Sequence, residues 1–372
     1  MGFYTMLMLV FVAGGLLEGA LFGLTLLEKR WYVTSVLGGI FSALSAWYIS
    51  WYTLGYYGAS EMNQTLSVAA CGWVAGLLLA LLPLAAGWLI HLAPAGREFA
   101  KAFSFLAALL SLGIGIYGSY TGPVYEDVTH FTVPAEDLPA AFQGYRIAQI
   151  TDTHIGPYYH VSDLAQDLDR AKEEGADMVA LTGDLIDDTR FLNDACRVLT
   201  EKAASFPGGI WYVWGNHEYF RGKENIREAI IKTPLILLEN GNRPLTQGGA
   251  SIYVAGTDYP WGDRDKLSSL EKTMADRAFA GIPKEKAVLF LAHHPDFIAE
   301  GFKRRAFLTL TGHTHGTQFG IMGEPLITPF SYTRGRYTDG KSVGYVSRGN
   351  GGWFPFRLGC SRELAIFTLK RV

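Results

Sequence analysis

The hydrophobic and polar positions divide the chain into two unlike parts. From Tyr4 to about Tyr120, long apolar runs cover roughly residues 4 to 27, 31 to 56, 66 to 93 and 102 to 120. Each run approaches or exceeds the ~20 residues that a helix needs to cross a bilayer. A cleaved signal peptide would explain the first run alone, but three more follow it and no basic residue precedes it. The pattern predicts an all-α transmembrane bundle of four helices over residues 1–121.

The basic residues between these runs predict an orientation. Lys29 and Arg30 lie between the first two runs, and Arg97 and Lys101 lie between the last two. The loop from about Tyr57 to Thr65 has neither Lys nor Arg. Because basic loops stay in the cytoplasm, both basic loops are expected there, and the rest of the chain is expected to be extracytoplasmic.

After residue 121 the pattern becomes that of a soluble domain. Residues 122–143 are expected to form a linker and a first strand, and residues 144–372 a domain with its own core. Seven runs are strand-like: YRIAQIT, DMVALTG, GIWYVWG, SIYVAGT, KAVLFLAH, AFLTLTG and ELAIFTL. Four are helix-like: VSDLAQDLDRAKEEG, FLNDACRVLTEKAA, KENIREAII and LSSLEKTMADRAF. This alternation predicts a layered α/β domain.

Overall composition adds little to this picture. The 372 residues carry a net charge of −3, and 49% of them are hydrophobic, so the chain is long enough for both parts. No nucleic-acid partner is expected. Cys71 lies in an apolar run, whereas Cys196 and Cys360 could pair outside the cytoplasm or remain free thiols.

Candidate chemistry gathers where the predicted strands end. Five of the seven strand-like runs are followed by Asp, His or Asn. In layered α/β domains the loops beyond the carboxyl ends of strands form the ligand crevice, so these side chains are expected to converge. They are Asp152 and His154, then Asp184, then Asn216, His217 and Glu218, then His293 and His294, and finally His313 and His315.

These residue types suit two adjacent divalent cations. Imidazole nitrogens and carboxylate oxygens bind Mn, Zn, Fe or Ni, and the absence of thiolates argues against a structural zinc site. Two cations ~3.5–4 Å apart polarise a phosphoryl oxygen and activate a water for in-line attack. The glycines beside the ligands fit tight turns that bring backbone close to the site.

The ordered motifs DTH, GD, GNHE, HH and GHTH resemble those of the calcineurin-like metallophosphoesterases over roughly residues 144 to 370. The resemblance implies a four-layer α-β-β-α sandwich with a dinuclear metal site, Mn being the expected metal. It assigns Asp184 as the bridging ligand. His217 would be the acid that assists the leaving group, with Glu218 orienting it, and Asn216 would also stabilise developing charge. The remaining ligands would be Asp152, His154 and His315 at one cation, and Asn216, His293 and His313 at the other.

Further assignments rest on the same resemblance. The family has one ligand in the fourth motif, and its pattern of histidine, any residue, proline selects His293 over His294. The tail resembles a membrane-associated branch, in which Arg348, Asn350 and Arg357 would lie near the substrate. Asp187 and Asp188, which follow the GD motif, are expected to be solvated at a helix start, and His294 to be structural or solvated.

The hypothesis is a membrane-anchored phosphohydrolase that cleaves a phosphoester or pyrophosphate bond of a lipid-linked substrate. One alternative resembles UDP-2,3-diacylglucosamine hydrolase of lipid A synthesis, but that reaction needs a cytoplasmic site. A second is a membrane sensor or binding module with an inactive phosphoesterase domain. A third treats the helices as an anchor only.

Two local features leave alternatives open. Glu18 lies inside the first apolar run, where an ionisable group is costly; it could contact a polar partner in the bundle or serve a substrate. Trp261 and Trp353 lie in loop-like contexts, where an aromatic side chain could belong to the core or touch an acyl chain.

Overall fold

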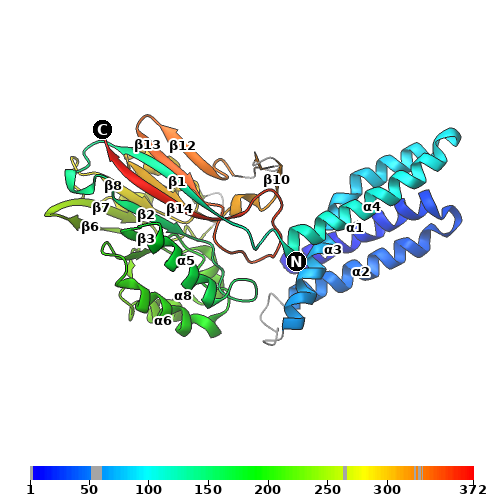
Figure 1. The fold of residues 1–372 in the computed structure, drawn as a ribbon, viewed down its shortest axis with the longest axis horizontal. Helices are drawn as coiled ribbons and strands as arrows, with labels where there is room; N and C mark the ends of the chain where they lie inside the picture. The colour runs from blue at the N-terminus through cyan, green and yellow to red at the C-terminus, as the bar shows by residue number, and fades with distance from the viewer. Residues whose placement is uncertain (1–2, 52–60, 263–265, 322–323, 326–327, 329) are drawn as a thin grey trace. The chain divides into compact units, whose positions relative to one another are not determined.

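The computed structural model describes residues 3–51, 61–262, 266–321, 324–325, 328 and 330–372. The chain divides into two compact units (Figure 1). The first comprises residues 1–124 with the short segment Phe354–Leu358, and the second comprises Tyr125–Trp353 and Gly359–Val372.

The first unit is a bundle of four long helices, which confirms the prediction from the apolar runs. They are α1 (Phe3–Leu26), α2 (Trp31–Trp51), α3 (Glu61–His91) and α4 (Arg97–Tyr120). All four are long and apolar enough to cross a membrane. Small residues let α3 and α4 approach closely, since a Cβ added to Gly115 would lie 2.2 Å from the carbonyl oxygen of Gly72.

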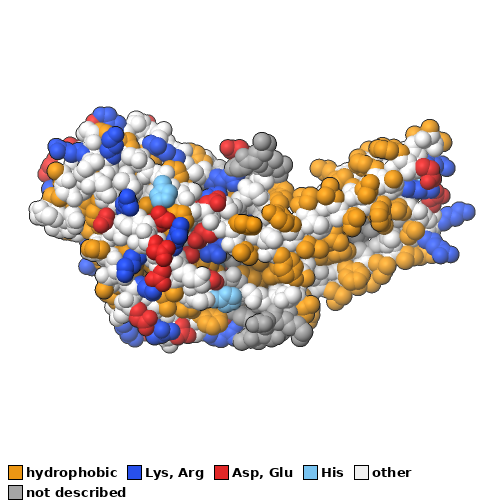
Figure 2. Space-filling model, viewed as in Figure 1, with side chains coloured by type: hydrophobic (Ala, Val, Ile, Leu, Met, Phe, Trp, Pro, Cys, Tyr) orange, Lys and Arg blue, Asp and Glu red, His pale blue; other side chains and the backbone are white. Residues whose placement is uncertain are grey.

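The surface of this unit is apolar along the helices. Figure 2 shows hydrophobic side chains along the visible face of the helices. In this unit Leu82 is 79% exposed and Leu110 is 66% exposed. Outward-facing leucines suit a lipid environment. The two basic loops lie at the same end of the bundle, because Nε2 of His91 is 4.0 Å from Oε1 of Glu28. The loop predicted around residues 57–65 lies partly outside the described residues.

The second unit contains two six-stranded sheets. The first has the order β1 (Glu126–Ala135), β14 (Arg362–Arg371), β2 (Arg146–Ile150), β3 (Met178–Leu181), β4 (Ile210–Tyr212) and β5 (Ile236–Leu237). The second has the order β12 (Gly335–Asp339), β13 (Ser342–Val346), β9 (Leu308–Thr311), β8 (Val288–Leu291), β7 (Ala250–Gly256) and β6 (Gly241–Gln247). A short pair, β10 (Gly320–Ile321) and β11 (Glu324–Pro325), stands apart from both.

The α-helices in the described part of this unit are α5 (Val161–Glu173), α6 (Leu192–Ala203), α7 (Asn216–Arg221), α8 (Lys223–Ile230), α9 (Leu267–Ala278) and α10 (Phe297–Lys303). Three apolar cores separate four layers. Residues of β2, β3 and β4 pack on one face against α5, α6 and α8, and on the other face against the second sheet. The outer face of the second sheet packs against α9 and α10.

Alternation along the strands produces these layers. In β3, Val179 and Leu181 face the helices, whereas Met178 and Ala180 face the second sheet. The four-layer α-β-β-α sandwich is therefore confirmed, as are all seven predicted strands and all four predicted helices of the soluble part. The prediction had no place for the edge strands β5, β6 and β12, or for β13, α7 and α10. Cys196 and Cys360 are both buried thiols that form no disulfide.

Candidate metal centre

The predicted metal ligands converge from both sheets. Loops that follow β2, β3 and β4 supply Asp152, His154, Asp184 and Asn216, and loops that follow β8 and β9 supply His293, His313 and His315. The β2 and β3 loops are tied by a hydrogen bond of 3.0 Å from the Asp152 N–H to the Gly183 carbonyl. The β8 and β9 loops are tied by a bond of 3.0 Å from the Gly312 N–H to the His293 carbonyl.

Left-handed backbone is concentrated at these positions. Asp152, His154, Asp184, His313 and His315 have φ angles of 52°, 49°, 52°, 73° and 50°. Such angles are uncommon in residues other than glycine, and the strain is tolerated where surrounding structure holds the turn. Each turn directs its side chain across the end of the sheets toward the shared centre.

Two glycines allow the loops to approach the carboxylates, as the sequence predicted. A Cβ on Gly312 would lie 2.2 Å from Oδ2 of Asp152, and a Cβ on Gly215 would lie 2.1 Å from Oδ1 of Asp184. Neither distance can be accommodated by a real side chain. Each glycine is therefore required by the site's packing.

Asp152, His154 and His315 form one candidate cation group. Nε2 of His154 lies 3.0 Å from Nε2 of His315, and Nε2 of His315 lies 3.5 Å from Oδ1 of Asp152. All three side chains are buried. The His313 N–H donates to both oxygens of Asp152 at 3.0 Å, which fixes the carboxylate.

Asp184, His293 and His313 form the adjoining group. Nε2 of His293 is 3.2 Å from Oδ2 of Asp184, and Nδ1 of His313 is 2.8 Å from Oδ1 of Asn216. The same Oδ2 of Asp184 is 3.7 Å from Nε2 of His154, in the first group. Asp184 therefore lies between the two groups, as a bridging ligand must.

The donor set fits divalent cations. Nδ1 of His293 is 2.7 Å from the Thr182 carbonyl oxygen. Its buried Nε2 faces Oδ2 of Asp184 at 3.2 Å but makes no hydrogen bond to any described residue. A histidine that binds a metal through one ring nitrogen typically donates the N–H of its other ring nitrogen, as Nδ1 of His293 can donate to the Thr182 carbonyl. Burial lowers the pKa of His293, but Asp184 and Asp152 outweigh it and raise the pKa to about 9, so a cation must displace a proton.

Asp187 contacts His217, the predicted general acid, although Asp187 was expected to be solvated. Oδ1 of Asp187 is 2.5 Å from Nδ1 of His217, and Oδ2 is 3.3 Å from Nδ1 of His154. The prediction of a solvated Asp187 was wrong, because its side chain is only 7% exposed. Burial lowers the pKa of His217, but Asp184 and Asp187 overcome this and raise it to about 9.

Glu218 has a different role from the one expected. Its buried carboxylate accepts hydrogen bonds from the N–H groups of Gly215, Asp184 and Leu185 at 2.8, 3.1 and 2.7 Å. It thereby joins the loops after β3 and β4. The prediction that Glu218 orients the His217 ring was wrong in its partner, since Asp187 makes that contact.

His294 and Asn350 have structural contacts. Nδ1 of His294 lies 3.1 Å from Oε1 of Glu271, which fits the expected structural role. Asn350 is fully buried, and its Oδ1 accepts from the Thr151 N–H at 3.0 Å. Asn350 therefore positions the loop that carries Asp152.

The two predicted substrate arginines are placed differently. The Arg348 guanidinium lies 3.1 Å from Asp127 and 3.2 Å from Glu363, so its charge is already balanced within the protein. Arg357 belongs to the segment Phe354–Leu358, which groups with the helical unit. Its N–H donates to the Gly118 carbonyl at 2.9 Å.

Exposed aromatic side chains stand next to His217. Phe220 is 63% exposed and Trp261 is 48% exposed. The Phe220 ring centroid is 5.6 Å from that of His217 and 5.0 Å from that of Trp261. The Trp261 ring also stacks on the Tyr219 ring, with the centroids 5.1 Å apart. Together Tyr219, Phe220 and Trp261 form the aromatic rim of the site.

A four-layer α/β sandwich with Asp and His ligands converging from both sheets defines a dinuclear metal-dependent hydrolase. The model of the calcineurin-like phosphoesterase family matches residues 145–317. The uncharacterized metallophosphoesterase YkuE of Bacillus subtilis is 31% identical over 74% of this chain and 97% of its own length. The chain belongs to the calcineurin-like metallophosphoesterases.

Two other relatives widen the comparison. The transmembrane protein with metallophosphoesterase domain of Danio rerio is 25% identical over 72% of this chain, which spans 62% of that relative's length. The phosphodiesterase YaeI of Escherichia coli is 26% identical over 73% of this chain and 98% of its own length.

Proposed function

We propose that the chain is a membrane-anchored phosphodiesterase or phosphatase that acts on a lipid-linked phosphate through two divalent cations, Mn being the expected metal. When bound, the cations would neutralise charge on the phosphoryl oxygens and activate a water for attack. Asp152, His154 and His315 would hold one, Asn216, His293 and His313 the other, and Asp184 would be shared.

His217 is the proposed general acid. Its Nδ1 contacts Asp187 at 2.5 Å, and its Nε2 lies on the side of Asp184, 4.0 Å from Oδ2. The side chain is 17% exposed, so part of the ring is open to solvent. Held in this way, the protonated ring donates its Nε2 proton to the departing oxygen. Asn216 stabilises charge from the neighbouring position.

The observation that carries the lipid assignment is the exposed aromatic rim. A soluble phosphoester gives no reason to keep Phe220 at 63% and Trp261 at 48% exposure beside the leaving-group acid. Aromatic faces bind acyl chains or hydrophobic headgroups well. The second support is the set of four helices that can cross a membrane.

We further propose that the catalytic unit is extracytoplasmic. Both basic loops lie at one end of the bundle, and basic loops favour the cytoplasmic side. This argues against a nucleotide-activated lipid of the cytoplasm as substrate. A protease-cleavable tag after Val372 tests the side: cleavage in intact cells supports the assignment, and cleavage only after lysis contradicts it.

Turnover by the full chain in detergent tests the activity. With Mn²⁺, we expect hydrolysis of bis-p-nitrophenyl phosphate, abolished in Asp184→Ala. Phe220→Ser with Trp261→Ser is expected to lower kcat/KM for a phospholipid while leaving the nitrophenyl substrate within about twofold. Absence of turnover with Mn, Zn, Fe or Ni by folded protein would favour the alternative of an inactive sensor. Equal losses on both substrates would remove the lipid assignment.

A further inference from the structure

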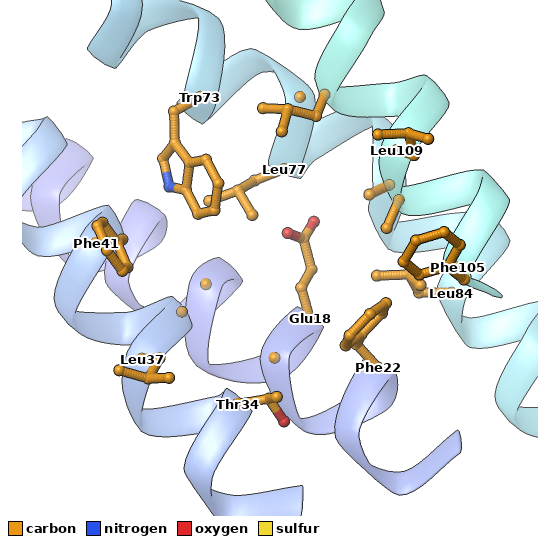
Figure 3. A pocket seen from close by; sticks show the side chains of 17 residues that line it. Glu18, Phe22, Thr34, Leu37, Phe41, Trp73, Leu77, Leu84, Phe105 and Leu109 are labelled. Carbon is orange, nitrogen blue, oxygen red and sulfur yellow. The ribbon is translucent and has the colours of Figure 1, made fainter. Parts of the chain in front are cut away.

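A cavity of about 370 Å³ lies between the helices of the bundle (Figure 3). Its walls are almost entirely apolar and include the aromatic rings of Phe22, Phe41, Trp73 and Phe105. Among the described residues that line it, Glu18 is the only one with an acidic or basic side chain. In Figure 3 its carboxyl group points into the space between Leu77 and Phe22.

Glu18 lies close to the middle of an apolar span. The span of α1 covers Met8–Leu26, so about half of it lies on either side of the residue. The side chain is only 3% exposed. Oε2 has no hydrogen-bond partner among the described residues. The alternative that Glu18 contacts a polar partner in the bundle therefore leaves this oxygen unexplained, and an unsatisfied carboxyl in hydrocarbon is costly.

A second lining residue, Trp73, also has a polar atom without a hydrogen-bond partner among the described residues. Nε1 of Trp73 is buried without a hydrogen-bond partner in the described part of the chain. The other polar lining side chain, Thr34, donates its hydroxyl to the Trp31 carbonyl at 2.8 Å. The cavity therefore combines one unsatisfied carboxyl with one unsatisfied N–H donor. Buried polar groups in proteins are normally paired, so both point to a ligand.

We propose that this cavity binds a lipid alcohol, an apolar chain that carries one hydroxyl group. A hydroxyl both donates and accepts, so it can pair with the Glu18 carboxyl, and the Trp73 indole N–H offers a further donor among the lining residues. The chain then packs against Phe22, Phe41 and Phe105. A plain hydrocarbon would leave both polar groups unpaired, and an organic cation would leave the indole N–H unpaired.

The ligand class has a chemical connection with the proposed activity. Hydrolysis of a lipid phosphomonoester releases a lipid alcohol, so the bundle could retain a product of that reaction. All the lining residues belong to the helical unit. Alcohol binding there therefore goes beyond the proposed function and does not require that hydrolysis be found.

Photolabelling of the full chain in detergent tests the proposal without metal or turnover. The probe is hexadecanol with a diazirine on its chain, and the competitors are hexadecanol, hexadecane and hexadecyltrimethylammonium. We expect labelled peptides from α1 and α3 and competition by the alcohol alone. Hexadecane competing as well as the alcohol, or the ammonium competing better, would overturn the proposal.

Variants locate the hydroxyl. Glu18→Leu and Trp73→Phe each remove one hydrogen bond, so each should lower labelling about fivefold to tenfold. Glu18→Gln keeps a donor and an acceptor and should retain most of the labelling. Trp47→Phe is the control, because Trp47 is 55% exposed and does not line the cavity. Wild-type labelling in Trp73→Phe contradicts the proposal even if Glu18→Leu fails to fold.

Discussion

Oδ1 of Asp187 lies 2.5 Å from Nδ1 of His217, while Oδ2 of the same carboxylate lies 3.3 Å from Nδ1 of His154. One buried aspartate thus fixes both the proposed acid and a proposed metal ligand. Nearby cationic imidazoles hold the pKa of Asp187 far below its usual range, although burial alone would raise it. The carboxylate is therefore a fixed negative charge behind both rings.

Asp187→Asn should lower kcat about tenfold to a hundredfold, the usual effect of losing a residue that orients ligands. The asparagine amide keeps the shape of the aspartate side chain, but it lacks the negative charge that faces the two imidazole rings. Asp188→Asn is the matched control, because Asp188 pairs with Arg190 instead, and it should remain within about twofold. Wild-type kcat in Asp187→Asn would show that the contact does not serve catalysis.

Substitutions of the two adjacent histidines, His293 and His294, should differ in their effect on metal content and activity. His293 faces Asp184 at 3.2 Å, whereas His294 faces Glu271 at 3.1 Å. We expect His293→Ala to lose one of the two cations and nearly all activity, and His294→Ala to keep both cations. Metal analysis of the purified chains gives the answer. Full metal content in His293→Ala, or loss only in His294→Ala, would reverse the ligand assignment.

Glu218→Gln should destabilise the catalytic unit. The carboxylate accepts from three backbone N–H groups at 3.1 Å or less, and a glutamine amide would place its own N–H groups against some of them. The cost should be about 1–3 kcal/mol, the penalty of unpaired buried groups. Thermal proteolysis of the full chain measures it. Glu224→Gln, on the exposed face of α8, is the control, and equal stability of the two variants would contradict the role.

Much of the fold followed from local pattern. Each of the seven strand-like runs is a short continuous or alternating apolar segment, which is why all became strands. The seven proposed ligands follow five of those strands directly. Since strand ends of a layered domain meet at one edge, adjacency in sequence carried over to proximity in space.

The contacts that the sequence did not predict depend on pairing between distant segments. Asp187 reaches His154 because Ile155 and Ile186 form a parallel bridge beyond the two motifs. The isoleucines that follow the DTH and GD motifs were the sequence signal from which this bridge could have been predicted. Asn350 acts through the backbone of Thr151, 199 positions away. The unpaired groups of the bundle cavity also depend on how the four helices pack, which apolar runs do not specify.

The buried carboxyl of Asp167 in α5 should make stability depend on pH. Oδ2 of Asp167 accepts from the Tyr159 hydroxyl at 2.7 Å, and Oδ1 is 3.4 Å from the Arg362 guanidinium. Burial first, and then repulsion from Glu126, raise the pKa of Asp167 from 3.8 to about 7. At pH values between about 4 and 7, the folded chain therefore binds more protons at this site than the unfolded chain does.

The free energy of unfolding should therefore fall as the pH rises from about 4 to 7, and this contribution should be constant above pH 7. Asp167→Asn keeps an oxygen for Tyr159 but carries no titrating proton, so it should lose this slope and gain stability relative to the native chain at pH 8. Tyr159→Phe removes a hydrogen bond that lowers the pKa of Asp167, so it should extend the slope above pH 7. Urea unfolding in detergent, followed by pulse proteolysis, measures all three chains. Parallel curves for the native chain and Asp167→Asn from pH 4 to 8 would show that the buried carboxyl titrates alike in both states.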